Sequence, residues 1–132
     1  MKKTFYFLTL IAAFAFISCS KEKTANNSTT ATVKYDFTTD KAGNFYAEFS
    51  TDSTQAGEAI TGLTWSKTIT INKQAQNNSV SFTVFAPLEW ATTADRANVV
   101  IKVSVDGVEK SSNSALMGGL DHAGGLTATT NF

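Results

Sequence analysis

The chain has 132 residues, and its 11 basic side chains balance 11 acidic ones. This balance excludes a strongly basic nucleic-acid-binding protein and a protein that holds an anionic lipid surface by charge. The only cysteine cannot form an intramolecular disulfide. Any histidine-based catalysis or metal binding has a single residue, His122, to use.

The first eighteen residues have the composition of a secretory leader. Lys2 and Lys3 give a basic start, and residues 5–17 form an apolar run, FYFLTLIAAFAFI. The run is shorter than the roughly 17 to 25 residues of a transmembrane helix. It is followed by Ser18 and by the only cysteine, Cys19. Without residues 1–18, nine basic and eleven acidic residues remain, so the net charge becomes −2.

The order of apolar run, small residue and cysteine resembles the lipobox of bacterial lipoproteins. The resemblance implies that residues 1–18 are removed and that the Cys19 thiol receives a diacylglycerol. It also implies that the new amino terminus carries a further acyl chain such as palmitate. Several acyl chains, at about 0.8 kcal/mol per buried methylene, make such an anchor close to permanent. The alternative is an ordinary leader cut elsewhere, which leaves Cys19 in the leader or as a free thiol.

The residues after Cys19 indicate where the anchored protein resides. Ser20 after the cysteine is compatible with passage to the outer membrane of Gram-negative cells. The string Ser20-Lys21-Glu22 resembles a short surface-display signal, with Lys23 in place of that signal's second acid. We expect a lipid anchor in the outer membrane, on its periplasmic or cell-surface face. The remainder of the segment 19–32 is polar and aperiodic, which predicts a flexible linker.

From Val33 onward, apolar and polar residues alternate with the period of a β-strand. The runs are rich in Val, Ile, Thr, Phe and Tyr, and they predict strands over residues 33–38, 45–50, 64–71, 80–86, 99–105 and 126–132. Asp106-Gly107 is a strong hairpin signal and predicts a further strand from Val108. Residues 51–61 read as a polar loop. We therefore predict an all-β domain over 33–132, an antiparallel immunoglobulin-like β-sandwich of about seven strands.

Three segments of this domain are similar to the MmpS family (mycobacterial membrane protein, small) and its bacterial lipoprotein relatives. They are the alternating strand around Tyr35, LTWSKT at 63–68 and VSVDG at 103–107, in matching order and spacing. The resemblance implies an immunoglobulin-like sandwich on the outer side of a membrane. The best-known members are accessory proteins of large export pumps. Thr64 stands where the family has proline, and the family's domain cysteines are absent.

Residues that could carry chemistry are sparse. Asp121 and His122 are the only acid–histidine neighbours, and no Gly-x-Ser-x-Gly elbow accompanies them. The carboxylates show no metal-ligand spacing. The glycine pairs at 118–119 and 124–125 precede no helix, so they are interpreted as turn residues rather than as a phosphate site. We predict that the protein is not an enzyme and that it holds no cofactor or metal.

Aromatic residues give the better indication of a binding surface. Tyr46 and Phe85 alternate out of phase with the apolar faces of their strands, and Trp90 follows Pro87 in a loop. Together, Tyr46, Phe85 and Trp90 would make a surface for a ligand or partner. The alternative is that sheet edges and loops bury them. Trp65, by contrast, is predicted to share a core-facing side with Leu63.

One modification site is also predicted in the polar loop. Asp52-Ser53-Thr54 resembles the sequon that some Gram-negative bacteria O-glycosylate, with Ser53 as the acceptor. The alternative is a plain Asx-type turn.

The sequence as a whole predicts a lipid-anchored lipoprotein of the cell envelope that works by binding. Its partners are expected to be the membrane, through the anchor, and a protein of the envelope, with no nucleic acid. The domain would be an accessory module for an export or surface assembly. The alternative is a surface lipoprotein that binds a glycan or a small hydrophobic ligand.

Overall fold

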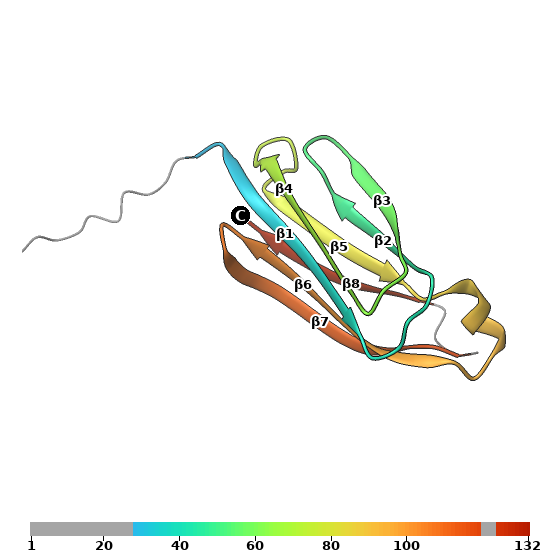
Figure 1. Cartoon of the computed structure of the whole chain (residues 1–132). Helices are drawn as coiled ribbons and strands as arrows, with labels where there is room; N and C mark the ends of the chain where they lie inside the picture. Colours follow the sequence, from blue (N-terminus) through green and yellow to red (C-terminus); the bar gives the residue numbers. More distant parts are fainter. Residues whose placement is uncertain (1–27, 120–123) are drawn as a thin grey trace, which may run out of the picture.

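The computed structural model describes residues 28–119 and 124–132. These residues form eight strands and one short 3-10 helix, η1 (Figure 1). The elements in chain order are β1 (Thr30–Thr39), β2 (Phe45–Ser50), β3 (Gln55–Ile60), β4 (Thr64–Asn72), β5 (Ser79–Phe85), η1 (Leu88–Thr92), β6 (Arg96–Val105), β7 (Val108–Gly118) and β8 (Gly125–Asn131).

The strands make two four-stranded sheets that pack face to face. The strand order is β4-β1-β6-β7 in the first, sheet A, and β3-β2-β5-β8 in the second, sheet B. Every pairing is antiparallel. This confirms the prediction of an all-β antiparallel sandwich, with eight strands in the described residues instead of about seven.

The additional strand is β3, in the segment that the sequence predicted as a loop. Its sequence, QAGEAI, is poor in β-branched and aromatic residues, so its propensity for a strand is low. Pairing with β2 along its whole length, from Phe45↔Ile60 to Ser50↔Gln55, overrides that propensity. The connection from β2 is a tight turn in which Thr51 N donates to Thr54 O at 2.8 Å.

The first strand also begins earlier than predicted. Residues 1–27 lie outside the described part of the chain, and with them the predicted leader, Cys19 and most of the predicted linker. Thr30–Thr32, the last residues of that linker, belong to β1, and Ala31 is buried in the core. The predicted Asp106-Gly107 hairpin is present between β6 and β7. Both residues have positive φ, 51° and 81°, as the type I′ turn requires.

The core lies between the sheets and consists of the inward residues of the alternating strands. Tyr35, Phe37, Phe45 and Phe82 are its largest fully buried side chains. Burial of each such apolar side chain stabilises the fold by about 1.5–3 kcal/mol. The Tyr35 hydroxyl donates to Ser50 O at 2.9 Å, and burial raises the pKa of Tyr35 well above its usual range, so the phenol stays a neutral donor.

Trp65 faces sheet B as predicted, but it is only half-buried because β4 is an edge strand. Its ring packs against Phe49 and Phe82, with centroid separations of 5.6 and 5.7 Å. Leu63 was predicted on the same buried side, and that prediction was wrong. Residues 61–63 form the bend that leads into β4, and Leu63 is 50% exposed.

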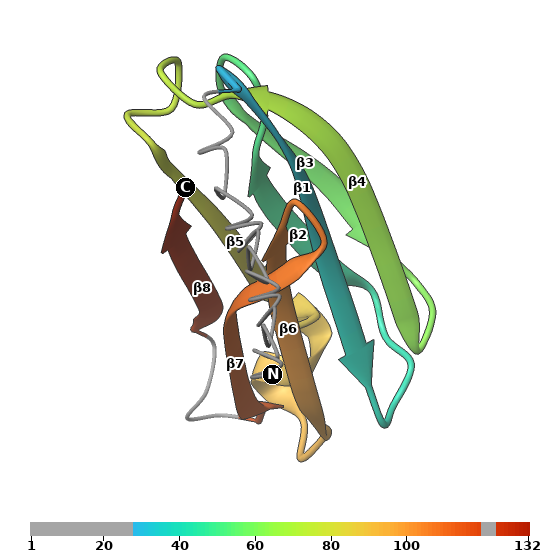
Figure 2. The same ribbon diagram turned by 90° about the vertical axis from the view of Figure 1, so that its left-hand side faces the viewer.

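The sandwich has two distinct ends. At the amino-terminal end, β1 begins beside the β4–β5 and β6–β7 turns, where Lys73 N donates to Thr29 O and Asp106 N to Thr32 O. The other end, which we call the η1 end, holds η1 and the β1–β2 and β3–β4 connections (Figures 1 and 2). β1 runs from one end to the other, and its ten residues span about 33 Å.

Candidate functional site

A surface groove lies at the η1 end, on the outer side of sheet B. Its volume is about 490 Å³, within the range of small-ligand sites. It is lined by Asn44, Tyr46, Phe85, Ala86, Leu88 and Glu89. Two of the three aromatic residues predicted for a binding surface, Tyr46 and Phe85, therefore lie together. We call this set of six residues the η1 groove.

The period of the strands explains why the two aromatics point outward. Phe45 and Ala47 are buried in the core, so Tyr46 between them faces solvent, and it is 46% exposed. Phe85 follows the buried Val84 in the same way and is half-buried. Tyr46 and Phe85 are direct register partners across β2 and β5, the two central strands of sheet B. This pairing brings residues 39 positions apart in the sequence next to each other.

Trp90, the third predicted surface aromatic, is buried instead, with 5% exposure. Pro87 ends β5, and its carbonyl accepts a hydrogen bond from Trp90 N at 3.0 Å. The tight turn of η1 then points Trp90 inward, where its ring meets Phe45 edge-on at 5.4 Å. Gly43 makes room for the ring, because a Cβ there would stand 2.8 Å from Trp90 Cζ2. Trp90 thus closes the hydrophobic core at the η1 end, and we call it the core plug.

Leu88 takes the surface position that the sequence assigned to Trp90. It is the first residue of η1 and is 89% exposed, the highest value among the large hydrophobic residues that the structure describes. Sequence reasoning missed Leu88, Asn44, Ala86 and Glu89. The proline directly after the predicted strand indicated a turn. A helix of one turn, however, is too short for a periodic pattern that would show which of its residues points inward.

Glycines on the neighbouring strands β3 and β8 leave room for the side chains of Tyr46 and Phe85 to pack flat against sheet B. A Cβ at Gly57 of β3 would stand 2.6 Å from Tyr46 Cζ. A Cβ at Gly125 of β8 would stand 2.9 Å from Phe85 Cε1. Tyr46 therefore extends over β3 and Phe85 over β8. The two rings and the two glycines form one low aromatic surface across all four strands of sheet B.

The rim of the groove is polar and acidic. Asn44 Nδ2 donates to Glu89 Oε1 at 3.3 Å, which links the β1–β2 connection to η1. Among the described residues, the lining contains one carboxylate and no lysine or arginine. Glu48 is exposed on the same outer face, two residues along β2 from Tyr46. The surface is therefore suited to neutral or cationic ligands rather than to anions.

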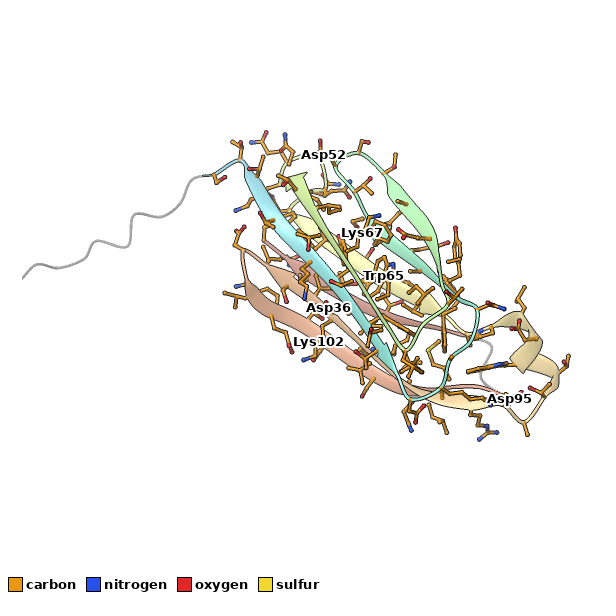
Figure 3. The ribbon with its side chains drawn as sticks, viewed as in Figure 1. Asp36, Asp52, Trp65, Lys67, Asp95 and Lys102 are labelled. Atoms are coloured by element: carbon orange, nitrogen blue, oxygen red, sulfur yellow. The ribbon has the colours of Figure 1, made fainter. Side chains whose placement is uncertain are left out.

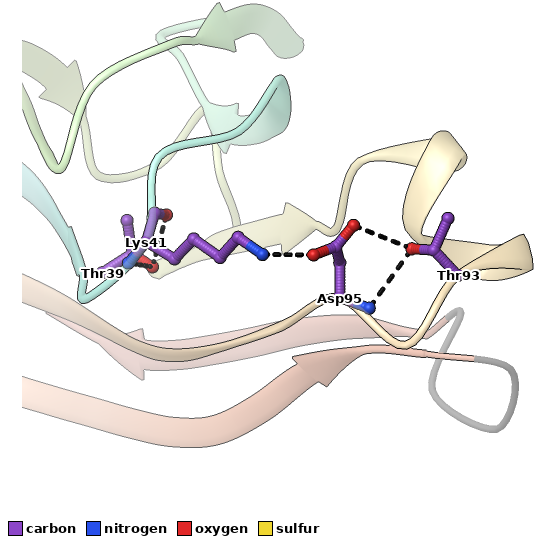
Figure 4. Close-up of polar contacts among 4 residues, drawn as sticks. All are labelled: Thr39, Lys41, Thr93 and Asp95. Carbon is purple, nitrogen blue, oxygen red and sulfur yellow. Dashed lines mark hydrogen bonds and ion pairs between the residues drawn. The ribbon is translucent and has the colours of Figure 1, made fainter.

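An ion pair beside the groove fixes the loops that shape it. Lys41 in the β1–β2 connection pairs with Asp95, which also accepts a hydrogen bond from Thr93 at 3.0 Å (Figure 4). The hydrogen bond from Lys41 lowers the pKa of Asp95, so the carboxylate stays charged at neutral pH. Lys41 Nζ also lies 5.3 Å from the Trp90 ring centroid, a cation–π distance. These contacts tie the β1–β2 connection to the segment that follows η1 and to the Trp90 ring.

A second polar cluster lies at the open side of the sandwich, between edge strands β3 and β4 (Figure 3). Lys67 Nζ and Glu58 Oε2 are 2.9 Å apart, and Trp65 Nε1 donates to Glu58 Oε1 at 3.4 Å. The hydrogen bond from Lys67 lowers the pKa of Glu58. Inward-pointing charges on edge strands oppose pairing with further strands. This cluster is therefore explained by protection of the edges.

The remaining predicted residues are placed as follows. Ser53 is exposed in the β2–β3 turn, and the neighbouring Asp52 Oδ1 accepts a hydrogen bond from Asn72 N. Asp121 and His122 lie outside the described residues. Within the described ranges, 28–119 and 124–132, no three His, Cys, Asp or Glu side chains gather into a metal site. The same part of the chain has no helix long and apolar enough to cross a membrane.

No family model, curated protein or solved structure matches the chain. The geometry of the η1 groove and the sequence around Cys19 are the observations that bear on function.

Proposed function

We propose that this protein is a lipid-anchored lipoprotein of the bacterial outer membrane whose β-sandwich binds a ligand or partner in the η1 groove. The observation that carries the proposal is the gathering of Tyr46, Phe85 and the almost fully exposed Leu88 at one end of the domain. Exposed apolar side chains that cluster in a concave site are typical of binding surfaces.

The position of the groove supports the anchored arrangement. The chain enters the domain at the amino-terminal end, about 33 Å along β1 from the η1 end. An anchor at Cys19 would therefore tether the domain by its amino-terminal end, with the η1 groove at the opposite end of the sandwich. Such a groove is accessible to molecules outside the membrane, on either its periplasmic or its cell-surface side.

The resemblance to the MmpS family supports one version of this proposal, an accessory module for an export or surface assembly. In that version a protein of the envelope occupies the η1 groove. The second version, a lipoprotein that binds a glycan or small hydrophobic ligand, is favoured by the size and the aromatic lining of the groove. Both versions use the same anchor and the same groove.

Two measurements test the proposal. Cells that express the protein are fed an alkyne fatty acid, and we expect the wild type to be labelled and Cys19→Ala to remain unlabelled. Equal labelling of the two would remove the lipid anchor from the proposal.

The groove is tested by photocrosslinking in whole cells. A benzophenone amino acid replaces Leu88 in the groove or, as the matched control, Val108, which is 55% exposed at the amino-terminal end. We expect a specific adduct from position 88 and none from position 108. Equal adduct patterns from the two positions would show that the groove has no specific binding partner.

A further inference from the structure

We propose that the η1 groove binds a neutral oligosaccharide, with Tyr46 and Phe85 stacking on the C–H faces of successive sugar rings. This inference rests on the proposed binding function and names its ligand class. It is carried by three properties of the groove: low-lying aromatic rings, an acidic hydrogen-bonding rim and a position over paired central strands.

The rings are arranged for stacking. Since Tyr46 lies over Gly57 and Phe85 over Gly125, each aromatic side chain is turned down toward the backbone beside it. Tyr46 is 46% exposed and Phe85 is half-buried, so both rings keep surface that a ligand can contact. A pyranose with equatorial hydroxyls has axial C–H groups on both faces, and these apolar faces match an exposed aromatic ring. Four strands at about 4.8 Å spacing give the aromatic surface a width of roughly 14 Å. This width exceeds one sugar ring and favours an oligosaccharide.

The rim provides partners for hydroxyl groups. A carboxylate has about four acceptor positions, and Asn44 occupies one position on Glu89, so others remain for ligand hydroxyls. Next to Phe85 on the outer face, Thr83 and Thr127 form a pair of hydroxyls 2.9 Å apart. These groups can accept and donate hydrogen bonds along a chain of sugars that continues past the aromatic rings.

The charge of the surface selects against acidic ligands. Glu89 is in the lining and Glu48 lies on the same face, and the part of the lining that the structure describes has no cationic side chain to oppose them. A phosphate, sulfate or uronate on the ligand would be repelled here. The charge of the surface is therefore compatible with a neutral sugar chain, and it disfavours fatty acids and anionic lipid headgroups.

The location in the fold separates a sugar from other occupants. A partner strand would add at a sheet edge, whereas Tyr46 and Phe85 stand on β2 and β5, whose backbone groups are paired on both sides. A small hydrophobic guest would require enclosure, whereas Leu88 is 89% exposed. The proposed tether to the bilayer is at the amino-terminal end, away from the groove. A flat amphipathic ligand that is half covered by the protein fits these conditions.

The experiment measures sugar binding by the full-length protein, purified from membranes in detergent, with isothermal titration calorimetry. The probes are cellohexaose, chitohexaose and maltohexaose, and hexagalacturonate serves as the anionic control. We expect at least one neutral hexasaccharide to bind and hexagalacturonate not to bind. Tyr46→Ala and Phe85→Ala should each weaken binding at least tenfold, while Val108→Ala should leave it unchanged.

One variant tests ring placement without removing an aromatic residue. In Gly57→Ala the new methyl group would displace the Tyr46 ring, so we expect sugar binding to fall at least fivefold although Tyr46 is present. Circular dichroism melting of each variant verifies that the sandwich is folded. Leu88 is almost fully exposed and contributes little to the buried core, so Leu88→Ala changes the groove without destabilising the fold.

Two results would overturn the inference. One is that no neutral hexasaccharide binds the wild type. The other is that binding is unchanged in the folded Tyr46→Ala and Phe85→Ala variants. If either occurs while position 88 still crosslinks in cells, the groove binds something other than a sugar and the proposed function survives. If crosslinking from position 88 also matches that from the control position, the proposed function fails together with the oligosaccharide inference.

Discussion

Replacement of the core plug Trp90 by alanine should be the more damaging of the two tryptophan substitutions. Trp90 is 5% exposed, and Phe45, Gly43 and Gly118 lie against its ring at the η1 end. Removal of a buried tryptophan costs about 3–5 kcal/mol, from lost transfer free energy and from the cavity left behind. The cation–π contact with Lys41 would be lost as well, at about 0.5–1 kcal/mol for an exposed cation.

The substitution Trp65→Ala provides the matched comparison. Trp65 contacts Phe49 and Phe82 but lies half-buried at the open side of the sandwich, so water can enter the space that it leaves. We expect about half the cost, roughly 2 kcal/mol, because only part of the ring's surface is removed from water.

Urea unfolding followed by circular dichroism measures both changes in the free energy of unfolding. We expect the free energy of unfolding to be lowest for Trp90→Ala, clearly higher for Trp65→Ala and highest for the wild type. If Trp65→Ala destabilises the protein as much as Trp90→Ala, the assignment of Trp90 as the plug of the η1 end is wrong. The comparison also matters for the groove, because loss of the plug would release Leu88 and Glu89 from their positions.

Further predictions concern the core, the open side and His122. Tyr35→Phe removes the donor to Ser50 O and should cost about 1–2 kcal/mol in urea unfolding, and an unchanged midpoint would contradict the buried hydrogen bond. The hydrogen bond from Lys67 lowers the folded-state pKa of Glu58, so its stabilising effect should be present above the ordinary value of 4.5 and disappear as the pH falls through the lowered pKa. A pH series should show this loss in wild type and a smaller one in Glu58→Gln. The double substitution Glu58→Val and Lys67→Val should leave the edges unprotected and produce oligomers in size-exclusion chromatography, whereas a monomer would refute their protective role. His122→Ala should still complement a deletion strain, and failure at normal protein levels would indicate an active site at this residue.

The sequence predicted the parts of the fold that depend on a two-residue period. Alternation placed Tyr35 and Phe37 inside, and it placed Tyr46 and Phe85 outside. It did not reveal that Tyr46 and Phe85 meet, because the register between β2 and β5 joins strands that are distant in the sequence. It missed β3 because QAGEAI has low strand propensity and is held by pairing with β2.

The candidate site was harder to predict than the fold because a helical turn shapes it. η1 has five residues, too few for a pattern that separates the inward Trp90 from the outward Leu88. An aromatic residue after Pro87 was therefore assigned to the surface, while the exposed leucine two positions before it was overlooked. Gly57 was predicted to lie in the polar loop 51–61, and Gly125 was interpreted as a turn residue. Their role beneath Tyr46 and Phe85 depends on contacts between strands.

The edges and ends of the sandwich, within the residues that the structure describes, differ in how well they could recognise a partner. The edges of β3 and β4 carry inward charges at Glu58 and Lys67, which oppose the addition of a strand. On the opposite side, Asn113 of β7 donates to the backbone of β8, so that side is bridged within the domain. The amino-terminal end is where the chain enters and where an anchor at Cys19 would keep it near the membrane. The η1 end has exposed apolar groups and hydrogen-bonding partners, and it lies far from the end at which the chain enters the domain. We therefore expect the domain to bind its partner there.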